Sequence, residues 1–328
     1  MNIDMHSHCV PRVLLDYIKK HGEKIGKTYI EEGGKEYIGV VGSNWKEHFR
    51  KGVYDADEII SEMKQARLDK MALSLSMGMH SYAYKGEDSL EAIKLCNDWM
   101  ADLAKSRPEH FYVMAALPMQ DAPLALQELE RAHEKLGFKA IVIGSMINDK
   151  MLDHEDFHPI YEYCAKKGIL VYLHPFYAAP FAPYLQYYTI NLVAFMTQTS
   201  LALTHLVFGG IFEKYPKLTV LASHGGGYFP YQFGRVKHVY KVRPEAKVVD
   251  IDSPEKYLKN IYFDTLTHGT PALQFLVDTY GADHVVLGTD YTFDMADMTP
   301  VDSVDTLRLT AAERDMICRK NAQMLMNL

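Results

Sequence analysis

Short apolar segments alternate with amphipathic segments along almost the whole chain. Eight apolar segments have the length and the β-branched or aromatic content of buried strands: Asn2–Met5, Lys70–Leu75, Tyr112–Ala116, Ala140–Ile143, Leu170–Leu173, Thr219–Ala222, Ile261–Phe263 and Val285–Leu287. Between them, apolar residues recur every three to four positions opposite a charged face, most clearly in Ala56–Arg67, Ser89–Ser106, Ala122–Leu136 and His158–Lys167. Eight strand–helix alternations predict an α/β fold, a (β/α)8 TIM barrel, instead of an open doubly wound sheet.

Two stretches interrupt this alternation. Gly26–Gly42 places Gly33 and Gly34 between two alternating runs, which predicts a small β-hairpin inserted after the first strand, within an insertion of about residues 26–54. Phe176–Tyr188 is rich in Pro, Tyr and Phe and directly follows the fifth strand. Loops after barrel strands build the catalytic face, so we expect both stretches to wall the pocket. No repeat or Gly/Ser linker marks a boundary, and residues 1–328 are expected to form a single domain.

Composition and charge indicate which binding partners, such as nucleic acids or membranes, the protein is expected to lack. The formal net charge of −7, without a basic stripe, argues against binding to nucleic acid. No apolar run reaches the roughly 18 to 20 residues of a membrane span, and the chain starts with the strand-like MNIDMHSH, so we expect no membrane and a cytoplasmic protein. The four cysteines lie far apart without a CxxC pair, which is typical of reduced, buried thiols.

The first predicted strand carries two histidines that share one face. Alternate residues of a strand point to the same side, so His6 and His8 in Asp-Met-His-Ser-His can approach one metal ion together. His174 ends the apolar run Gly-Ile-Leu-Val-Tyr-Leu, and Asp290 ends Val-Val-Leu-Gly-Thr, at the strand ends where barrels place their catalytic residues. Three imidazoles and one carboxylate suit Zn²⁺, with Mn²⁺ or another divalent metal as alternatives.

A further histidine follows another predicted strand, in Ser-His-Gly-Gly-Gly. We assign His224 as the acid/base group, because an imidazole exchanges protons near neutral pH, whereas a fifth ligand would leave the metal little room for substrate. Asp290 is counted with it as catalytic. The alternative is that the glycines form a simple turn capped by His224. Arg235, eleven residues further on, can hold a carboxylate through two parallel hydrogen bonds, and Asp264 at a strand end is expected to orient a neighbouring group.

Four segments, IDMHSH, HPF, HGGGYFPYQFGRV and VVLGTDYTF, together resemble the amidohydrolase-related decarboxylases across nearly the whole chain. The resemblance implies a distorted (β/α)8 barrel that binds zinc through His6, His8, His174 and Asp290, with His224 beside the metal-bound water. It also implies a homodimer in which Arg235 reaches the neighbouring subunit's pocket and binds the substrate carboxylate.

The region that carries a second carboxylate-binding arginine in the family departs from the pattern here. Ser-Asn-Trp-Lys-Glu-His-Phe-Arg aligns only loosely with it, which leaves Lys46 or Arg50 as the candidate cation. Phe176 follows the His-Pro where the family enzyme has tryptophan, and Phe176 and Tyr177 are the aromatic candidates for contact with the substrate.

These observations predict a metal-dependent, non-oxidative decarboxylase, a carbon–carbon lyase of aromatic compound catabolism. Its substrate is expected to be a small unsaturated or aromatic carboxylic acid. The same groups also fit a hydrolase or hydratase that acts on a ring-cleavage product through metal-activated water. A non-catalytic metal-binding barrel is the alternative from a different class, and a closed structural site would not need His224 at a separate strand end.

Overall fold

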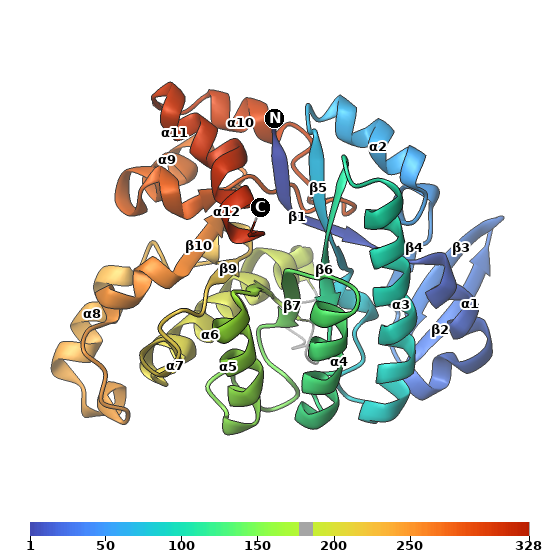
Figure 1. Ribbon diagram of the computed structural model, residues 1–328, viewed down its shortest axis with the longest axis horizontal. Helices are drawn as coiled ribbons and strands as arrows, with labels where there is room; N and C mark the ends of the chain where they lie inside the picture. Colours follow the sequence, from blue (N-terminus) through green and yellow to red (C-terminus); the bar gives the residue numbers. More distant parts are fainter. Residues whose placement is uncertain (177–185, 328) are drawn as a thin grey trace.

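Eight parallel strands form the barrel in a computed structural model, which describes residues 1–176 and 186–327 (Figure 1). Their order around the sheet is that of the chain: β1 (Ile3–Cys9), β5 (Lys70–Leu75), β6 (Phe111–Ala116), β7 (Ala140–Gly144), β8 (Leu170–His174), β9 (Val220–Ala222), β10 (Ile261–Asp264) and β11 (Val285–Val286). Each observed strand lies at or within a few residues of a segment expected from the sequence. The (β/α)8 prediction is therefore confirmed.

The first and last strands meet through the segment after β11. Met5 N donates to Leu287 O at 2.8 Å, and His8 N donates to Tyr291 O at 2.6 Å. The side chain of Thr289 adds a hydrogen bond of 2.6 Å to the buried carboxylate of Asp4. Residues nearly 300 positions apart in the sequence thus close the barrel.

Helices cover the outside of the barrel. They are α1 (Arg12–His21), α2 (Ala56–Gln65), α3 (Gly86–Ser106), α4 (Ala122–Glu134), α5 (His158–Lys167), α6 (Met196–Phe208), α7 (Ile211–Lys214), α8 (Phe233–Val242), α9 (Thr270–Tyr280), α10 (Pro300–Asp305), α11 (Ala311–Asp315) and α12 (Asn321–Leu325). Side-chain caps fix where several begin: Asp55 accepts from two backbone N–H groups of α2, and Thr310 and Glu313 form a capping box at α11. Helix α8 projects at the outer edge of the molecule, far from the insertion after β1 (Figure 1).

The insertion after β1 is a three-stranded antiparallel sheet, one strand more than the expected hairpin. It consists of β2 (Lys27–Glu32), β3 (Lys35–Val40) and β4 (Lys46–His48). Gly33 and Gly34, with φ of 59° and 73°, make the tight turn that the sequence indicates. The sequence Lys-Glu-His of β4 carries no apolar alternation, and pairing with β3 alone defines this strand.

The stretch Gln186–Phe208 corrects one sequence expectation. This single helical stretch is long and apolar enough to span a membrane by length and composition, with a mean hydropathy of 1.3 in a window of which 33% is buried. Scattered Thr, Gln and Ser residues break the apolar run, which is why no continuous run stands out in the sequence. One face of α6, including Leu203 and Leu206, packs into the core, while Leu192 and Leu201 are exposed.

Candidate metal centre and active site

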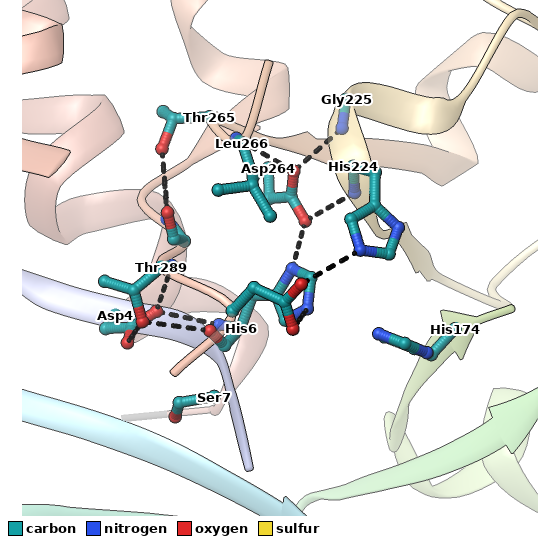
Figure 2. Close-up of polar contacts among 12 residues, drawn as sticks. Asp4, His6, Ser7, His174, His224, Gly225, Asp264, Thr265, Leu266 and Thr289 are labelled. Carbon is teal, nitrogen blue, oxygen red and sulfur yellow. Dashed lines mark hydrogen bonds and ion pairs between the residues drawn. The ribbon is translucent and has the colours of Figure 1, made fainter. Parts of the chain in front are cut away.

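Five side chains from four strand ends converge at the mouth of the barrel, and Figure 2 labels His6, His174 and His224 among them. His6 and His8 lie on β1, His174 ends β8, and His224 and Asp290 follow β9 and β11. His6 Nε2 and His8 Nε2 lie 3.1 and 3.2 Å from the same carboxylate oxygen, Asp290 Oδ1. His224 Nε2 instead lies 3.3 Å from the other oxygen, Oδ2. Ligand-type atoms of His6, His174, His224 and Asp290 all lie within 4.8 Å of one another.

The hydrogen bonds of two histidines set which ring nitrogen is free. His174 Nδ1 lies 2.9 Å from Pro175 O, and because a carbonyl oxygen only accepts, Nδ1 carries the hydrogen. His6 Nδ1 lies 2.6 Å from the carboxylate oxygen Asp264 Oδ2 and donates to it in the same way. In both rings the lone pair is therefore on Nε2, the atom that faces the centre of the cluster.

His8 follows the same rule through a serine hydroxyl. Ser74 Oγ donates to Ser7 O at 3.1 Å, so the hydroxyl oxygen accepts from His8 Nδ1 at 2.9 Å. His8 Nε2 is then left without a hydrogen. In their neutral forms all three imidazoles thus present a lone pair toward Asp290, which is the arrangement that a metal ion requires of its histidine ligands.

Unpaired buried atoms test whether a metal fits this site. Nε2 of His6, His8 and His174 and Asp290 Oδ1 are buried and have no hydrogen-bond partner among the residues that the structure describes. Each buried polar atom left unpaired costs about 1–3 kcal/mol. A divalent cation would satisfy all four atoms together, so the residues present fit a metal. His224 differs from the other three histidines because its Nε2 contacts Asp290 Oδ2 at 3.3 Å, while its Nδ1 is buried without a partner among the described residues.

Burial and neighbouring charges set the protonation of the ligands. Burial lowers the pKa of His8, and burial with the surrounding imidazoles lowers that of His174 well below its usual value. Both rings are therefore neutral. For His6, burial lowers the pKa, but the carboxylates of Asp290 and Asp264 outweigh burial and raise it to about 10. That positive charge balances the carboxylates, and a bound dication would take its place.

Asp264 holds two parts of the site in register (Figure 2). Besides the bond from His6, its buried carboxylate accepts from the backbone N–H groups of His224 at 2.9 Å, Gly225 at 2.8 Å and Leu266 at 3.1 Å. The loop that carries His224 is therefore fixed to the same carboxylate that orients a metal-binding histidine. The expectation that Asp264 orients a neighbour agrees with these contacts.

His224 lies in a backbone conformation that non-glycine residues rarely adopt. Its φ is 55°, and Asp290 has a φ of 59°. The glycines after His224 allow close packing within the protein: a Cβ on Gly226 would lie 2.6 Å from the ring of Phe263, and one on Gly227 would lie 2.4 Å from Met196 O. The glycine run therefore serves this loop's packing and strained geometry.

A cavity of about 300 Å³ opens beside His224 and Asp290. It is lined mostly by apolar and aromatic residues, with His268 as a further titratable group: Asn191, Leu192, Met196, Gly227, Tyr228, Tyr231, Leu266, Thr267, His268, Ala272 and Met295. A larger hollow of about 420 Å³ lies between α3, α4 and the start of β6, and none of the five converging side chains lines it. The smaller cavity is therefore the one that adjoins His224 and Asp290.

The candidate substrate residues are not gathered in this cavity. Arg235 is exposed on α8 and does not line it. Phe176 is half-buried and packs on Tyr82, with ring centroids 4.8 Å apart. Tyr177 lies outside the described residues.

The two candidate cations of the insertion pair with carboxylates elsewhere. Lys46 pairs with Glu32 on the outer face of the inserted sheet and lies over the ring of Tyr37. Arg50 Nη1 donates to Glu62 on α2 at 2.8 Å. Neither lines the cavity, so the structure gives no support to Lys46 or Arg50 as a substrate anchor.

Sequence reasoning missed several residues of the site. Ser74, which orients His8, has no signal because it is one polar residue within an apolar strand. Tyr228, Tyr231 and His268 line the cavity, and each lies in a loop or turn after β9 or β10, where only His224 and Asp264 had been singled out. These residues could have been found by considering every residue of the loops that follow the strands.

Comparisons with known proteins agree with this architecture. Residues 3–328 match the family model described as amidohydrolase. The chain is 31% identical over 309 residues to 2-amino-3-carboxymuconate-6-semialdehyde decarboxylase of Dictyostelium discoideum, covering 94% of this chain and 86% of the relative. It is 28% identical over 292 residues to gamma-resorcylate decarboxylase of Polaromonas sp., covering 83% and 87%.

Solved structures share the fold. A 5-carboxyvanillate decarboxylase of Sphingomonas paucimobilis superposes with a TM-score of 0.82 at 20% identity, covering 100% of this chain and 99% of that one. A 5-carboxyvanillate decarboxylase of Novosphingobium aromaticivorans, with bound manganese, gives a TM-score of 0.83 at 22% identity, covering 100% and 97%. At these identities the likeness concerns the fold alone.

Proposed function

Because this chain belongs to the amidohydrolase family, we propose that it is a metal-dependent, non-oxidative decarboxylase of an unsaturated or aromatic carboxylic acid. The observation that carries the proposal is the set of four unpaired ligand atoms with His224 beside it, facing a cavity of about 300 Å³. The named decarboxylases among its relatives favour loss of carbon dioxide over hydrolysis.

We propose zinc as the metal, held by His6, His8, His174 and Asp290, with manganese as the alternative. A nitrogen-rich set of three imidazoles and one carboxylate favours zinc among divalent ions. When bound, such an ion supplies a Lewis acid for the substrate's carboxylate or an oxygen beside it. Metal content of the purified protein, measured by mass spectrometry after mild isolation, would decide between zinc and manganese.

His224 is proposed to supply the proton that replaces the carboxylate. When the carbon–carboxylate bond breaks, its electron pair stays on the substrate carbon, which then takes up one proton as carbon dioxide leaves. The His224 ring lies at the cavity wall and contacts Asp290 Oδ2 through Nε2, so the carboxylate can hold the ring in position during the transfer. The apolar and aromatic lining keeps water from the developing carbanion and suits a flat ring.

Release of carbon dioxide tests the reaction. Hydroxybenzoates, aminobenzoates and carboxymuconate semialdehydes are offered to metal-loaded and chelated enzyme, and metal-dependent release is expected from one class. His224→Asn should lower kcat by about 10²- to 10⁴-fold while metal content stays unchanged. His154→Asn, a replacement at the start of a helical turn remote from the cavity, is the matched control. Hydration or hydrolysis of a ring-cleavage product without carbon dioxide release would instead establish the alternative chemistry.

We also propose a homodimer in which Arg235 anchors the substrate carboxylate in the partner's cavity. Support comes from the exposure of Arg235 on the projecting helix α8 and from apolar side chains exposed elsewhere on the surface, including Leu192, Leu201 and Tyr228. Mixing inactive His224→Asn and Arg235→Ala subunits should restore about a quarter of wild-type activity, because half of the dimers then contain one intact site. No recovery after subunit exchange would refute the shared site.

We propose that the enzyme works in the cytoplasm. All four cysteines, Cys9, Cys96, Cys164 and Cys318, are buried free thiols, which suits a reducing compartment. Cell fractionation with an antibody to the chain would test this.

A further inference from the structure

Two buried polar side chains, Lys27 and His80, and the half-buried Glu47 lie between the inserted sheet and the loop after β5. Lys27 comes from β2, Glu47 from β4, and His80 from the loop after β5. Lys27 Nζ donates to His80 O at 3.0 Å, and Ser76 Oγ donates to Glu47 Oε2 at 2.9 Å. None of the three belongs to the metal-binding cluster or to the mechanism proposed above, so their burial needs a separate explanation.

The packing of this interface is close and specific. Ser81 Oγ donates to Ile25 O at 2.7 Å and joins the loop to the start of the inserted sheet. Gly78 leaves room for Trp45 and Glu47, since a Cβ there would lie 2.5 Å from the Trp45 ring and 3.4 Å from Glu47 Oε2. The sheet therefore presents Glu47 to the barrel in a defined position.

The geometry of β5 places the three residues beside the metal cluster. Ser74 Oγ contacts His8, and Ser76 Oγ contacts Glu47. Ser76 follows β5 directly, and its backbone N–H donates to Cys9 O at 3.0 Å, at the end of the strand that carries His8. Glu47 therefore lies near the end of β1. Strand β9, which precedes His224, is three strands from β1 around the closed barrel, by way of β10 and β11.

The three side chains do not satisfy one another. Lys27 and Glu47 form no direct ion pair in the part of the chain that the structure describes, although each affects the other's pKa. Glu47 Oε1 and both ring nitrogens of His80 are buried without a hydrogen-bond partner among the described residues. His80 is 2% exposed, and its ring lies close to the backbone of Leu75, at the end of β5.

The pKa shifts of Lys27 and Glu47 also indicate that the two side chains do not fully compensate each other. Burial lowers the pKa of Lys27 to about 8, although Glu47 opposes the shift. Burial raises the pKa of Glu47 to about 7, against the effects of Ser76 and Lys27. Two opposite charges that compensated each other fully would not both shift toward neutrality. A third polar group between them would complete the arrangement.

We propose that Lys27, Glu47 and His80 form a second substrate subsite, beside His8, that binds a hydroxyl substituent of the substrate ring. The inference rests on the proposed decarboxylase function. Lys27 has two unused N–H donors and Glu47 one unused acceptor. A hydroxyl group can accept a hydrogen bond from Lys27 and donate one to Glu47. A carboxylate in this position would face the acceptor oxygen of Glu47, so the subsite favours a hydroxylated aromatic acid over a dicarboxylic acid.

Paired substrates and variants test the subsite. The test compares a monohydroxybenzoate, the dihydroxybenzoate with one further hydroxyl, and the diacid with a carboxylate in its place, using kcat/KM for metal-loaded enzyme. Wild-type enzyme should prefer the dihydroxy acid about 10- to 100-fold. Glu47→Gln, which is nearly isosteric, and Lys27→Met should lose most of this preference while changing kcat/KM for the monohydroxy acid less than about threefold. Lys70→Met, which also removes a lysine bonded to a backbone carbonyl, is the matched control.

Other results would distinguish failure of the subsite from failure of the proposed decarboxylase function. Equal losses with both hydroxy acids, or a lowered Tm with unchanged preference, would show a structural cluster that holds only water and would overturn the subsite. Preference for the diacid would also overturn it. Titration calorimetry with mono- and dihydroxyphenols, which cannot decarboxylate, gives an independent readout: hydroxyl-dependent affinity that is lost in Glu47→Gln would support the subsite even if no acid released carbon dioxide.

Discussion

Replacing Asp264 by Asn tests how the metal site is prepared for its ion. In the native protein the two carboxylate oxygens accept four hydrogen bonds, from His6 Nδ1 and from the backbone N–H groups of His224, Gly225 and Leu266. Asparagine keeps the shape but has only one acceptor oxygen. If that oxygen accepts from Gly225 and Leu266, the amide NH₂ faces the two remaining donors, His6 Nδ1–H and the backbone N–H of His224.

The structure gives the size of the effect. Two charge-assisted hydrogen bonds are lost, each worth about 1.5–3 kcal/mol, so the free energy of unfolding should fall by at least about 3 kcal/mol. For a chain of 328 residues, with about 2.1 cal/mol/K of unfolding entropy per residue, that corresponds to a Tm lower by at least about 4 °C. To avoid facing an NH₂ group, His6 must move its hydrogen from Nδ1 to Nε2. That change removes a metal-binding lone pair, so metal affinity should fall about 10- to 100-fold.

Competition with a chromophoric chelator measures the metal affinity, and calorimetry of the metal-free protein measures Tm. Asp55→Asn is the control, because Asp55 caps α2 far from the cluster and asparagine caps equally well. Wild-type zinc affinity in Asp264→Asn would mean that Asp264 does not set the His6 tautomer. The argument from free Nε2 atoms would then fail for this ligand.

Further predictions concern stability away from the metal ligands. Burial lowers the pKa of His80 to about 3, so below pH 6.5 the unfolded chain binds a proton that the folded chain does not. The free energy of unfolding should therefore fall by about 1.4 kcal/mol per pH unit toward pH 5. In urea titrations, His80→Phe should flatten this pH dependence. Thr310→Ala removes the capping box of α11 and should cost about 1 kcal/mol by the same assay, whereas Thr310→Ser should cost little. Asn97→Leu removes the hydrogen bonds of Asn97 to the backbone of Ala116 and to the side chain of Glu128. If the free energy of unfolding fell by less than about 1 kcal/mol, these hydrogen bonds would not be stabilising the fold.

The barrel and the metal cluster could be predicted from the sequence because both depend on local patterns. Alternation of strands and helices defines the barrel, and parallel strands bring their C-terminal ends to one face. Polar residues at those ends, such as His174 and Asp290, must therefore meet wherever the strands are correctly identified. The pair His6 and His8 needs only the two-residue period of a strand.

The residues that could not be predicted depend on packing between distant segments. Lys27, Glu47 and His80 come from three elements and are adjacent only because the inserted sheet packs on the loop after β5. Lys46 was a candidate substrate cation together with Arg50, yet the alternation of β4 turns Lys46 outward to Glu32 and Glu47 inward to Ser76. A strand of three polar residues gives no sign of which face is buried.

The junction between β1 and the segment after β11 also has a consequence for biosynthesis. His6 O accepts from the backbone N–H of Asp290, so the same contact that closes the barrel brings the last ligand to the first ones. During translation His6 and His8 are made long before Asp290, the carboxylate that they contact. High-affinity metal capture must therefore wait until Asp290 has been made, and the ion, once bound, fastens together segments that lie far apart in the sequence.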